Sequence, residues 1–99
     1  MSGGNWKAMF KAIQENDLEL VKFYLKSHID PNYQHPEFMA LPLAESIRYS
    51  NLKITKLLLL NGANPLIKEI ESNLTPLELA KEMKNQKAID LLTLFNQSI

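Results

Sequence analysis

The dominant feature of this 99-residue chain is a pattern that recurs at equal intervals, with Lys7, Leu41 and Thr75 at the head of three segments. The matched positions that follow are Ala12, Ser46 and Ala80; Leu20, Ile54 and Ala88; Val21, Thr55 and Ile89; Phe23, Leu57 and Leu91; and Tyr24, Leu58 and Leu92. A period of about 34 residues is typical of repeat proteins whose units stack, because one unit is too small to bury its own apolar face. We call this alignment of the three segments the repeat register.

Each segment has the pattern of two short helices. The first helices are expected at 6–15, 42–49 and 76–83, and the second at 18–26, 52–60 and 87–95. Pro42 and Pro76 suit a first helical turn, whose amide groups need no partner within the helix. In the second helices the apolar residues recur three and four apart, which is the spacing of one buried helical face.

Turn residues separate these helices. Asn16, Ser50 and Lys84 stand at the breaks between first and second helices, and Gly62 suits a left-handed cap after the middle second helix. Turns rich in proline and asparagine follow at 29–32 and 63–65, and exposed loops follow at 33–39 and 66–73. The pattern therefore predicts an all-α fold, an α-solenoid of three stacked helix-turn-helix repeats with short outward loops.

The expected domain covers 6–95, with repeats at about 6–39, 40–73 and 74–95. Residues 1–5 are expected to form a flexible lead-in, and residues 96–99 a C-terminal tail. Trp6 is expected to shield the open face of the first repeat, with its indole body buried and its N–H in water.

Two stretches resemble the ankyrin repeat family: LLLLNGANP at 57–65 and TPLELA at 75–80. The resemblance extends over most of the chain and implies that partner proteins bind on a concave side, which the first helices and the loop tips line. The family usually has a histidine where this chain has Phe10, Ala44 and Glu78, and Leu41 replaces the usual threonine. The hydrogen bonds that usually join neighbouring repeat openings are therefore expected to be missing, so that stability depends on packing.

The composition argues against several classes of partner. Eleven basic residues balance eleven acidic ones, without the basic excess that nucleic acid or an anionic membrane requires. The chain has no cysteine and no apolar run long enough to cross a bilayer, so the cytoplasm is its expected location.

The sequence offers no arrangement of residues that is typical of catalysis. His28 and His35 lack a partner at the spacing of metal sites or catalytic pairs, and three glycines cannot build a phosphate-binding loop. His28 is instead expected to end a helix, because it shares the register of Gly62. We expect no enzyme, no cofactor, no metal and no small-molecule substrate.

The leading hypothesis is a protein-interaction module, either an adaptor or a small inhibitor, which binds another protein through the concave face. Aromatic residues, methionine and arginine are enriched at protein interfaces. The candidate contacts are Tyr33, Phe38, Arg48, Tyr49, Glu82 and Met83. The alternative is a structural unit that self-associates or belongs to a longer repeat array, with Leu94 and Phe95 at the exposed end. The expected state is a monomer or a weak homodimer.

Overall fold

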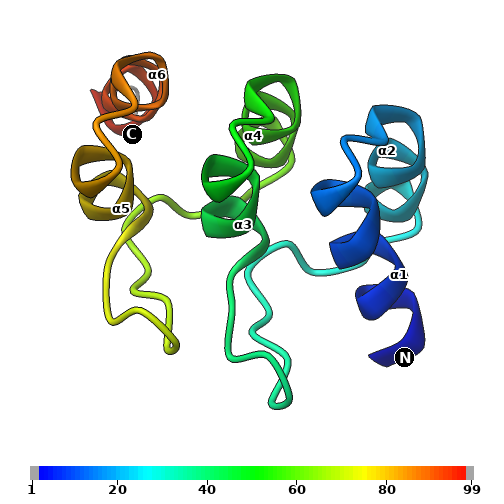
Figure 1. Ribbon diagram of the computed structural model, residues 1–99. Helices are drawn as coiled ribbons and strands as arrows, with labels where there is room; N and C mark the ends of the chain where they lie inside the picture. The colour runs from blue at the N-terminus through cyan, green and yellow to red at the C-terminus, as the bar shows by residue number, and fades with distance from the viewer. Residues whose placement is uncertain (1–2, 98–99) are drawn as a thin grey trace.

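The computed structural model describes residues 3–97, and this part of the chain folds into six helices without a strand (Figure 1). Along the chain they are α1 (Gly3–Gln14), α2 (Leu18–Lys26), α3 (Pro42–Arg48), α4 (Leu52–Leu60), α5 (Pro76–Glu82) and α6 (Gln86–Gln97). Each first helix packs on its own second helix, and α3 also packs between α1 and α5. The predicted all-α solenoid of three helical pairs is confirmed.

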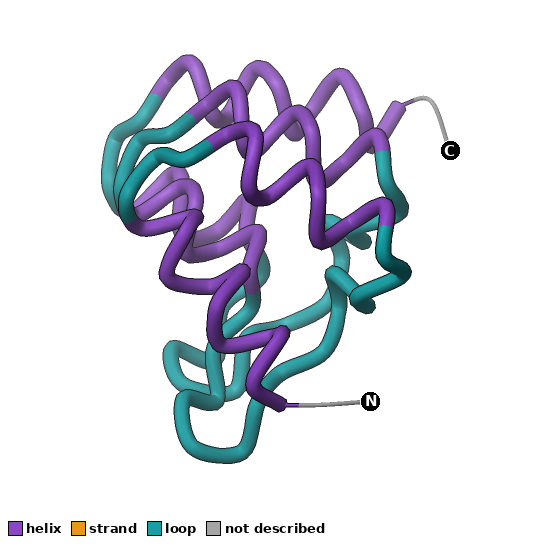
Figure 2. Tube along the Cα trace, turned by 90° about the vertical axis from the view of Figure 1, so that its right-hand side faces the viewer, coloured by secondary structure: helices purple, strands orange, loops and turns teal. Residues whose placement is uncertain are grey.

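Two layers of helices make up the solenoid. Figure 2 views the molecule along the stack: α1, α3 and α5 form one layer, α2, α4 and α6 form the other, and the long loops extend beyond the first layer. Both layers contribute to the core. Its largest fully buried side chains include Met9, Ile13, Leu43, Ile47, Ile54, Leu58 and Leu92.

The predicted helix breaks are confirmed by a conformation that recurs in every repeat. Asn16, Ser50 and Lys84 have φ angles of 59°, 55° and 56°. The residue after each of them donates its backbone N–H to the carbonyl of the small residue in the repeat register, at 2.8–3.0 Å; these acceptors are Ala12, Ser46 and Ala80. All three small residues are almost fully buried, so their size lets the two helices of a pair approach closely.

The same register governs the ends of the second helices. His28 has a φ of 68° and Gly62 has a φ of 98°, and both follow the cap residue of a second helix. The prediction that His28 ends a helix is therefore confirmed. Met39 and Asn73, which are also equivalent in the repeat register, have φ angles of 51° and 60° near the ends of the long loops.

Two helix ends differ from the prediction by more than one residue. α1 begins at Gly3, so residues 3–5 are helical although we expected them in a flexible lead-in; residues 1 and 2 lie outside the described part of the chain. α6 continues to Gln97, so the predicted tail at 96–99 is helical in its first half, and residues 98 and 99 lie outside the described part. The bounds of α2 and α4 agree with the prediction.

An aromatic cluster explains why α1 starts early. The indole of Trp6 is 2% exposed and stacks on Phe10 and on His35, with ring centroids 4.8 and 5.3 Å away. Tyr33 and Phe38 complete the cluster from the loop. The packing role expected of Trp6 is confirmed. Its N–H, however, is buried without a hydrogen-bond partner in the described chain, so the expectation that it reaches water is wrong.

Hydrogen bonds of two side-chain amides lie between the first two repeats in the turns and loops, away from the repeat openings. Asn32 donates from its side-chain amide to the Gly62 carbonyl at 3.0 Å and accepts from the Asn64 N–H at 2.7 Å. Further along the loop, Gln34 makes the same pair of bonds to Lys68 and Ile70. Side-chain amides thus join the turn and loop of the first repeat to those of the second. We call Asn32 and Gln34 the amide ladder.

Candidate protein-binding face

A groove of about 810 Å³ lies between the first two repeats, on the layer of first helices. Residues of α1 form one wall, α3 forms the floor, and the long loops close the remaining side. The lining residues are Lys7, Phe10, Lys11, Gln14, Glu15, Glu37, Phe38, Ala40, Glu45, Arg48 and Glu71. We call this groove the concave groove, because it lies on the side where the family resemblance places partner proteins.

Charged pairs flank the concave groove. Lys7 pairs with Glu37 across the gap between α1 and the loop. The hydrogen bond and the charge of Lys7 hold the pKa of the Glu37 carboxyl below its ordinary value of 4.5. Lys11 and Glu15 form a longer pair at 4.0 Å along α1. The groove therefore offers charges of both signs around an aromatic patch of Phe10 and Phe38, whose stacked rings are 5.4 Å apart.

Arg48 is bound within the molecule more firmly than its sequence position indicates. Its guanidinium donates to Glu69, whose side chain is fully buried, and to Glu45 at 2.8 Å. Burial lowers the pKa of Arg48, but the hydrogen bonds and charges of the two glutamates outweigh it and raise the pKa above its ordinary value. Glu69 also accepts from the Leu41 N–H at 3.1 Å, at the opening of the second repeat.

This network joins the first repeat to the second and reaches the loop that leads to α5. Gln14 of α1 donates to Glu45 of α3 at 2.7 Å, and Glu69 lies in the loop that leads to α5. Arg48 is central to it, with 28% of its side chain exposed toward the concave groove. The arrangement positions Arg48 rigidly, and any contact between Arg48 and a partner would use this remaining exposed part.

The structure places the six candidate contacts in three locations. Phe38 and Arg48 meet in the concave groove. Tyr49 and Met83 are the cap residues of α3 and α5, 50% and 40% exposed, and Glu82 precedes Met83 on the surface. Tyr33 is 44% exposed and packs edge-on against Trp6, away from the groove lining.

Sequence reasoning missed the contribution of α1 to the groove. Lys7, Phe10 and Lys11 were not among the candidate contacts, yet they face the loop that carries Glu37 and Phe38. Their spacing of three and four along one helix is the signal that would have placed them on a common face. The position of the loop that faces these residues depends on tertiary packing, and the helical spacing alone does not indicate it.

Within residues 3–97 no helix is both long and apolar enough to cross a bilayer. The same part of the chain contains no group of three histidine, cysteine or acidic side chains arranged to hold a metal ion.

Comparison with known proteins agrees with this architecture. The family model described as ankyrin repeats (3 copies) matches residues 9–98. The chain is 33% identical over 72 residues to human 2-5A-dependent ribonuclease, covering 73% of this chain and 10% of that protein. It is 31% identical over 83 residues to a putative ankyrin repeat protein of Acanthamoeba polyphaga mimivirus, covering 84% of this chain. The chain spans half of the viral protein and a tenth of the ribonuclease. With three helical pairs in one register and a family match over most of its length, this chain belongs to the ankyrin repeat family.

Proposed function

We propose that this chain is a non-catalytic adaptor or small inhibitor that binds a partner protein with its concave face. Ankyrin repeats are generally protein–protein interaction modules. The partner proposed here is another protein, and a cytoplasmic location stays a prediction.

The observation that carries the proposal is a set of exposed large side chains in the first long loop and at the ends of the first helices. Phe38 is 40% exposed beside the concave groove, and Tyr49 and Met83 are half exposed at equivalent positions of successive repeats. Aromatic residues and methionine supply much of the binding energy at protein interfaces. A stack of three repeats offers enough surface for an interface of standard size, about 800 Å² on each side.

The test places a photo-crosslinking amino acid, benzoylphenylalanine, at Tyr49 or at Met83, in cells from which the protein comes. A matched probe at Lys26, which is exposed at the end of α2, reports on the opposite layer. We expect the first two probes to capture the same discrete protein and the Lys26 probe to leave it uncaptured. Equal capture from all three positions, or none from Tyr49 and Met83, would contradict the proposal.

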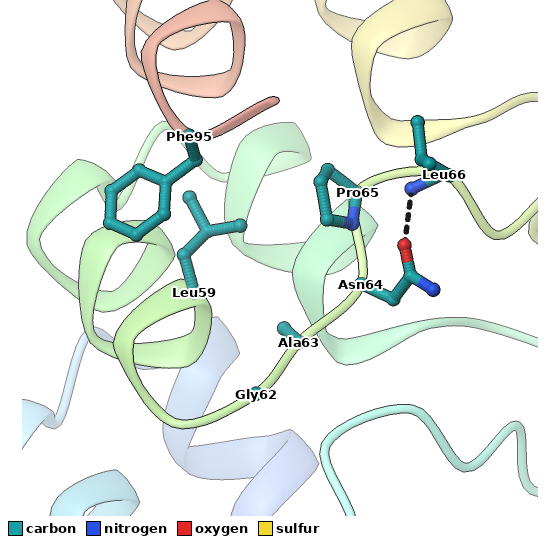
Figure 3. A pocket seen from close by; sticks show the side chains of 7 residues that line it. All are labelled: Leu59, Gly62, Ala63, Asn64, Pro65, Leu66 and Phe95. Carbon is teal, nitrogen blue, oxygen red and sulfur yellow. Dashed lines mark hydrogen bonds between the residues drawn. The ribbon is translucent and has the colours of Figure 1, made fainter. Parts of the chain in front are cut away.

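The alternative function is structural, and an apolar hollow between the second and third repeats favours it. Figure 3 shows this hollow of about 500 Å³, where Leu59 and Phe95 lie against each other and the turn with Ala63, Pro65 and Leu66 curves beside them. Leu66 is 60% exposed. A second copy of the chain, or a further repeat, would cover these side chains.

Light scattering after size-exclusion chromatography separates the two functions. If the chain self-associates through the hollow beside Leu66, the dimer fraction should rise with protein concentration. At a given concentration this fraction should be lower in Leu66→Ser than in the parent. Because Leu66 is exposed, this variant should melt at the temperature of the parent. A monomer at every concentration would eliminate the structural alternative for this isolated chain.

A further inference from the structure

The layer of second helices is basic, although the whole chain has no net charge. α2, α4 and α6 together contain five lysines and two acidic residues. Since the chain has eleven residues of each sign, the first helices and loops have the compensating acidic excess. The first helices hold four basic and three acidic residues, so the acidic excess lies in the loops and turns, and the layer of second helices is the most basic part of the described chain.

A small hollow lies on this basic layer, between α2 and α4. It has a volume of about 230 Å³ and is lined by Leu18, Lys22, Lys53, Lys56, Leu57 and Leu60. Leu18 and Leu57 are half buried, while Leu60 is 64% exposed at one end. We call this site the convex hollow. It combines an apolar floor with a rim of three ammonium groups.

The ammonium groups of the rim are largely uncompensated. Lys53 and Lys56 form no ion pair with any side chain of residues 3–97, and both are exposed. Lys22 has a carboxylate of Glu19 at 3.8 Å, but this oxygen belongs to a side chain that is 82% exposed. In the concave groove, by contrast, Lys7, Lys11 and Arg48 each have a carboxylate partner. An incoming carboxylate therefore gains more at the convex hollow.

The same residue types recur one repeat further along. The equivalent positions of the next repeat hold Leu52, Lys56, Lys87, Asp90, Leu91 and Leu94. Lysines and leucines are kept at every position except Asp90, which accepts a hydrogen bond from Gln86 at 2.8 Å. The basic and apolar stripe therefore continues across the stack from α2 to α6.

We propose that the convex hollow binds an acidic peptide segment of a second partner protein, by seating one large apolar side chain between flanking carboxylates. Such a site goes beyond the concave-face function, because it would let one chain hold two proteins at once. The apolar floor receives the side chain, and Lys22, Lys53 and Lys56 pair with the carboxylates.

The dimensions and chemistry favour a peptide over other ligands. Pockets for drug-sized molecules usually measure about 300–1,000 Å³, which exceeds this hollow. A nucleic acid backbone would use the lysines but leave the leucine floor without a partner. A membrane would require several apolar side chains that protrude together, whereas Leu18 and Leu57 recede between the two helices and Leu60 alone of the lining leucines is exposed.

The experiment titrates ¹⁵N-labelled protein with a capped peptide that has a leucine or a phenylalanine flanked on both sides by glutamates. We expect saturable chemical-shift changes at Lys22, Lys53, Lys56, Leu57 and Leu60, which weaken as salt is added. The double variant Lys53→Glu/Lys56→Glu should bind about tenfold more weakly or worse. Its fold should persist, because Lys53 lies in the first turn of α4, where an acidic residue suits the helix dipole.

A matched control carries the same charge change at the same spacing. Lys81→Glu/Lys84→Glu alters two exposed lysines of the third repeat outside the hollow and should bind the peptide as the parent does. Peptides with serine for the apolar residue, or glutamine for glutamate, should bind more weakly. Three outcomes overturn the proposal: no saturable shifts with either peptide at millimolar concentration, equal loss in both double variants, or shifts at these residues caused by phosphatidylserine vesicles and not by the peptides.

Discussion

At the scale of single residues, the backbone is strained at turn residues that have a left-handed conformation and a side chain. Lys84 has a φ of 56° at the break between α5 and α6. A side chain with a Cβ is disfavoured in this conformation by about 1 kcal/mol, and glycine is not. We therefore expect Lys84→Gly to raise the free energy of unfolding by about 0.5–1 kcal/mol in urea titrations, after the greater freedom of glycine in the unfolded chain is included. Lys84→Ala removes the same side chain and keeps the strain, so a stabilisation of equal size in Lys84→Ala would contradict this explanation.

Arg48 gives the second prediction at this scale. Arg48→Ala should lower the free energy of unfolding by about 2–3 kcal/mol, because it leaves the buried carboxylate of Glu69 without its main partner. The partial exposure of Arg48 keeps the cost below that of a fully buried pair. The double variant Arg48→Met/Glu69→Leu should recover part of the loss, since it removes both charges but leaves the Leu41 N–H without its acceptor. Equal stability of the single and double variants in urea denaturation would show that packing, and not the ion pair, is responsible.

The sequence predicted the position of Arg48 but not its partner. The repeat register places Arg48 at the end of a first helix. Glu69 lies in a loop that has no periodicity, and only the tertiary path of that loop brings its carboxylate beneath Arg48. For the same reason, Asn32 and Gln34 were not recognised as partners of backbone groups in the next repeat. Residues whose roles depend on a loop path were therefore the ones that sequence reasoning missed.

At the scale of elements, the start of α5 is set by a reciprocal cap. The Thr75 hydroxyl accepts from the Glu78 N–H at 3.2 Å, and the Glu78 carboxylate accepts from the Thr75 N–H at 2.9 Å. Thr75→Ala should therefore cost about 1 kcal/mol of unfolding free energy, as measured by thermal or urea denaturation. Thr75→Ser keeps the hydroxyl and serves as the control. A loss of the same size in Thr75→Ser would assign the effect to the methyl group instead.

The same cap predicts a dependence on pH. The hydrogen bond from the Thr75 N–H, with smaller contributions from nearby lysines, holds the pKa of Glu78 below 4.5 in the folded chain. A carboxyl whose pKa is lower in the folded state stabilises the fold above its unfolded pKa, and this contribution is lost as the pH falls through the folded pKa. Unfolding free energies measured from neutral pH down through pH 4.5 should therefore decline less steeply in Glu78→Ala than in the parent. Parallel curves would contradict the role of this carboxylate.

Helix bounds could be predicted where the signals are local. α2 and α4 agree with the prediction because Asn16 and Ser50 mark the turns before them and Gly62 follows the second. The start of α1 could not be predicted in this way, since glycines at 3 and 4 are poor helix formers. The contacts of Trp6 with the distant loop stabilise this end of the helix, and no local pattern indicates them.

At the scale of the whole molecule, the amide ladder couples the first repeat to the second but has no counterpart at the next step. In the repeat register, Leu66 and Lys68 stand where the first loop has Asn32 and Gln34, and neither side chain has an amide. In a solenoid, stability depends on the interfaces between neighbouring repeats as well as on each repeat itself. The two interfaces of this chain therefore differ in kind: polar bridges reinforce the first, while the second relies more on apolar packing of α5 and α6 against α3 and α4.

This asymmetry predicts how the molecule responds when the ladder is removed. Asn32→Leu/Gln34→Lys gives the first loop the residues of the second and deletes four exposed hydrogen bonds, so unfolding free energy should fall by about 2 kcal/mol. Because the loss is confined to one interface, amide hydrogen exchange should accelerate most in α1 and α2, and the urea transition should broaden as the first repeat opens before the others. The matched change Leu66→Asn/Lys68→Gln introduces amides where no facing repeat is described and should leave exchange in α1 and α2 as in the parent. Uniform acceleration through all six helices would show instead that the three repeats unfold as one cooperative unit, with the ladder contributing to the whole rather than to its first interface.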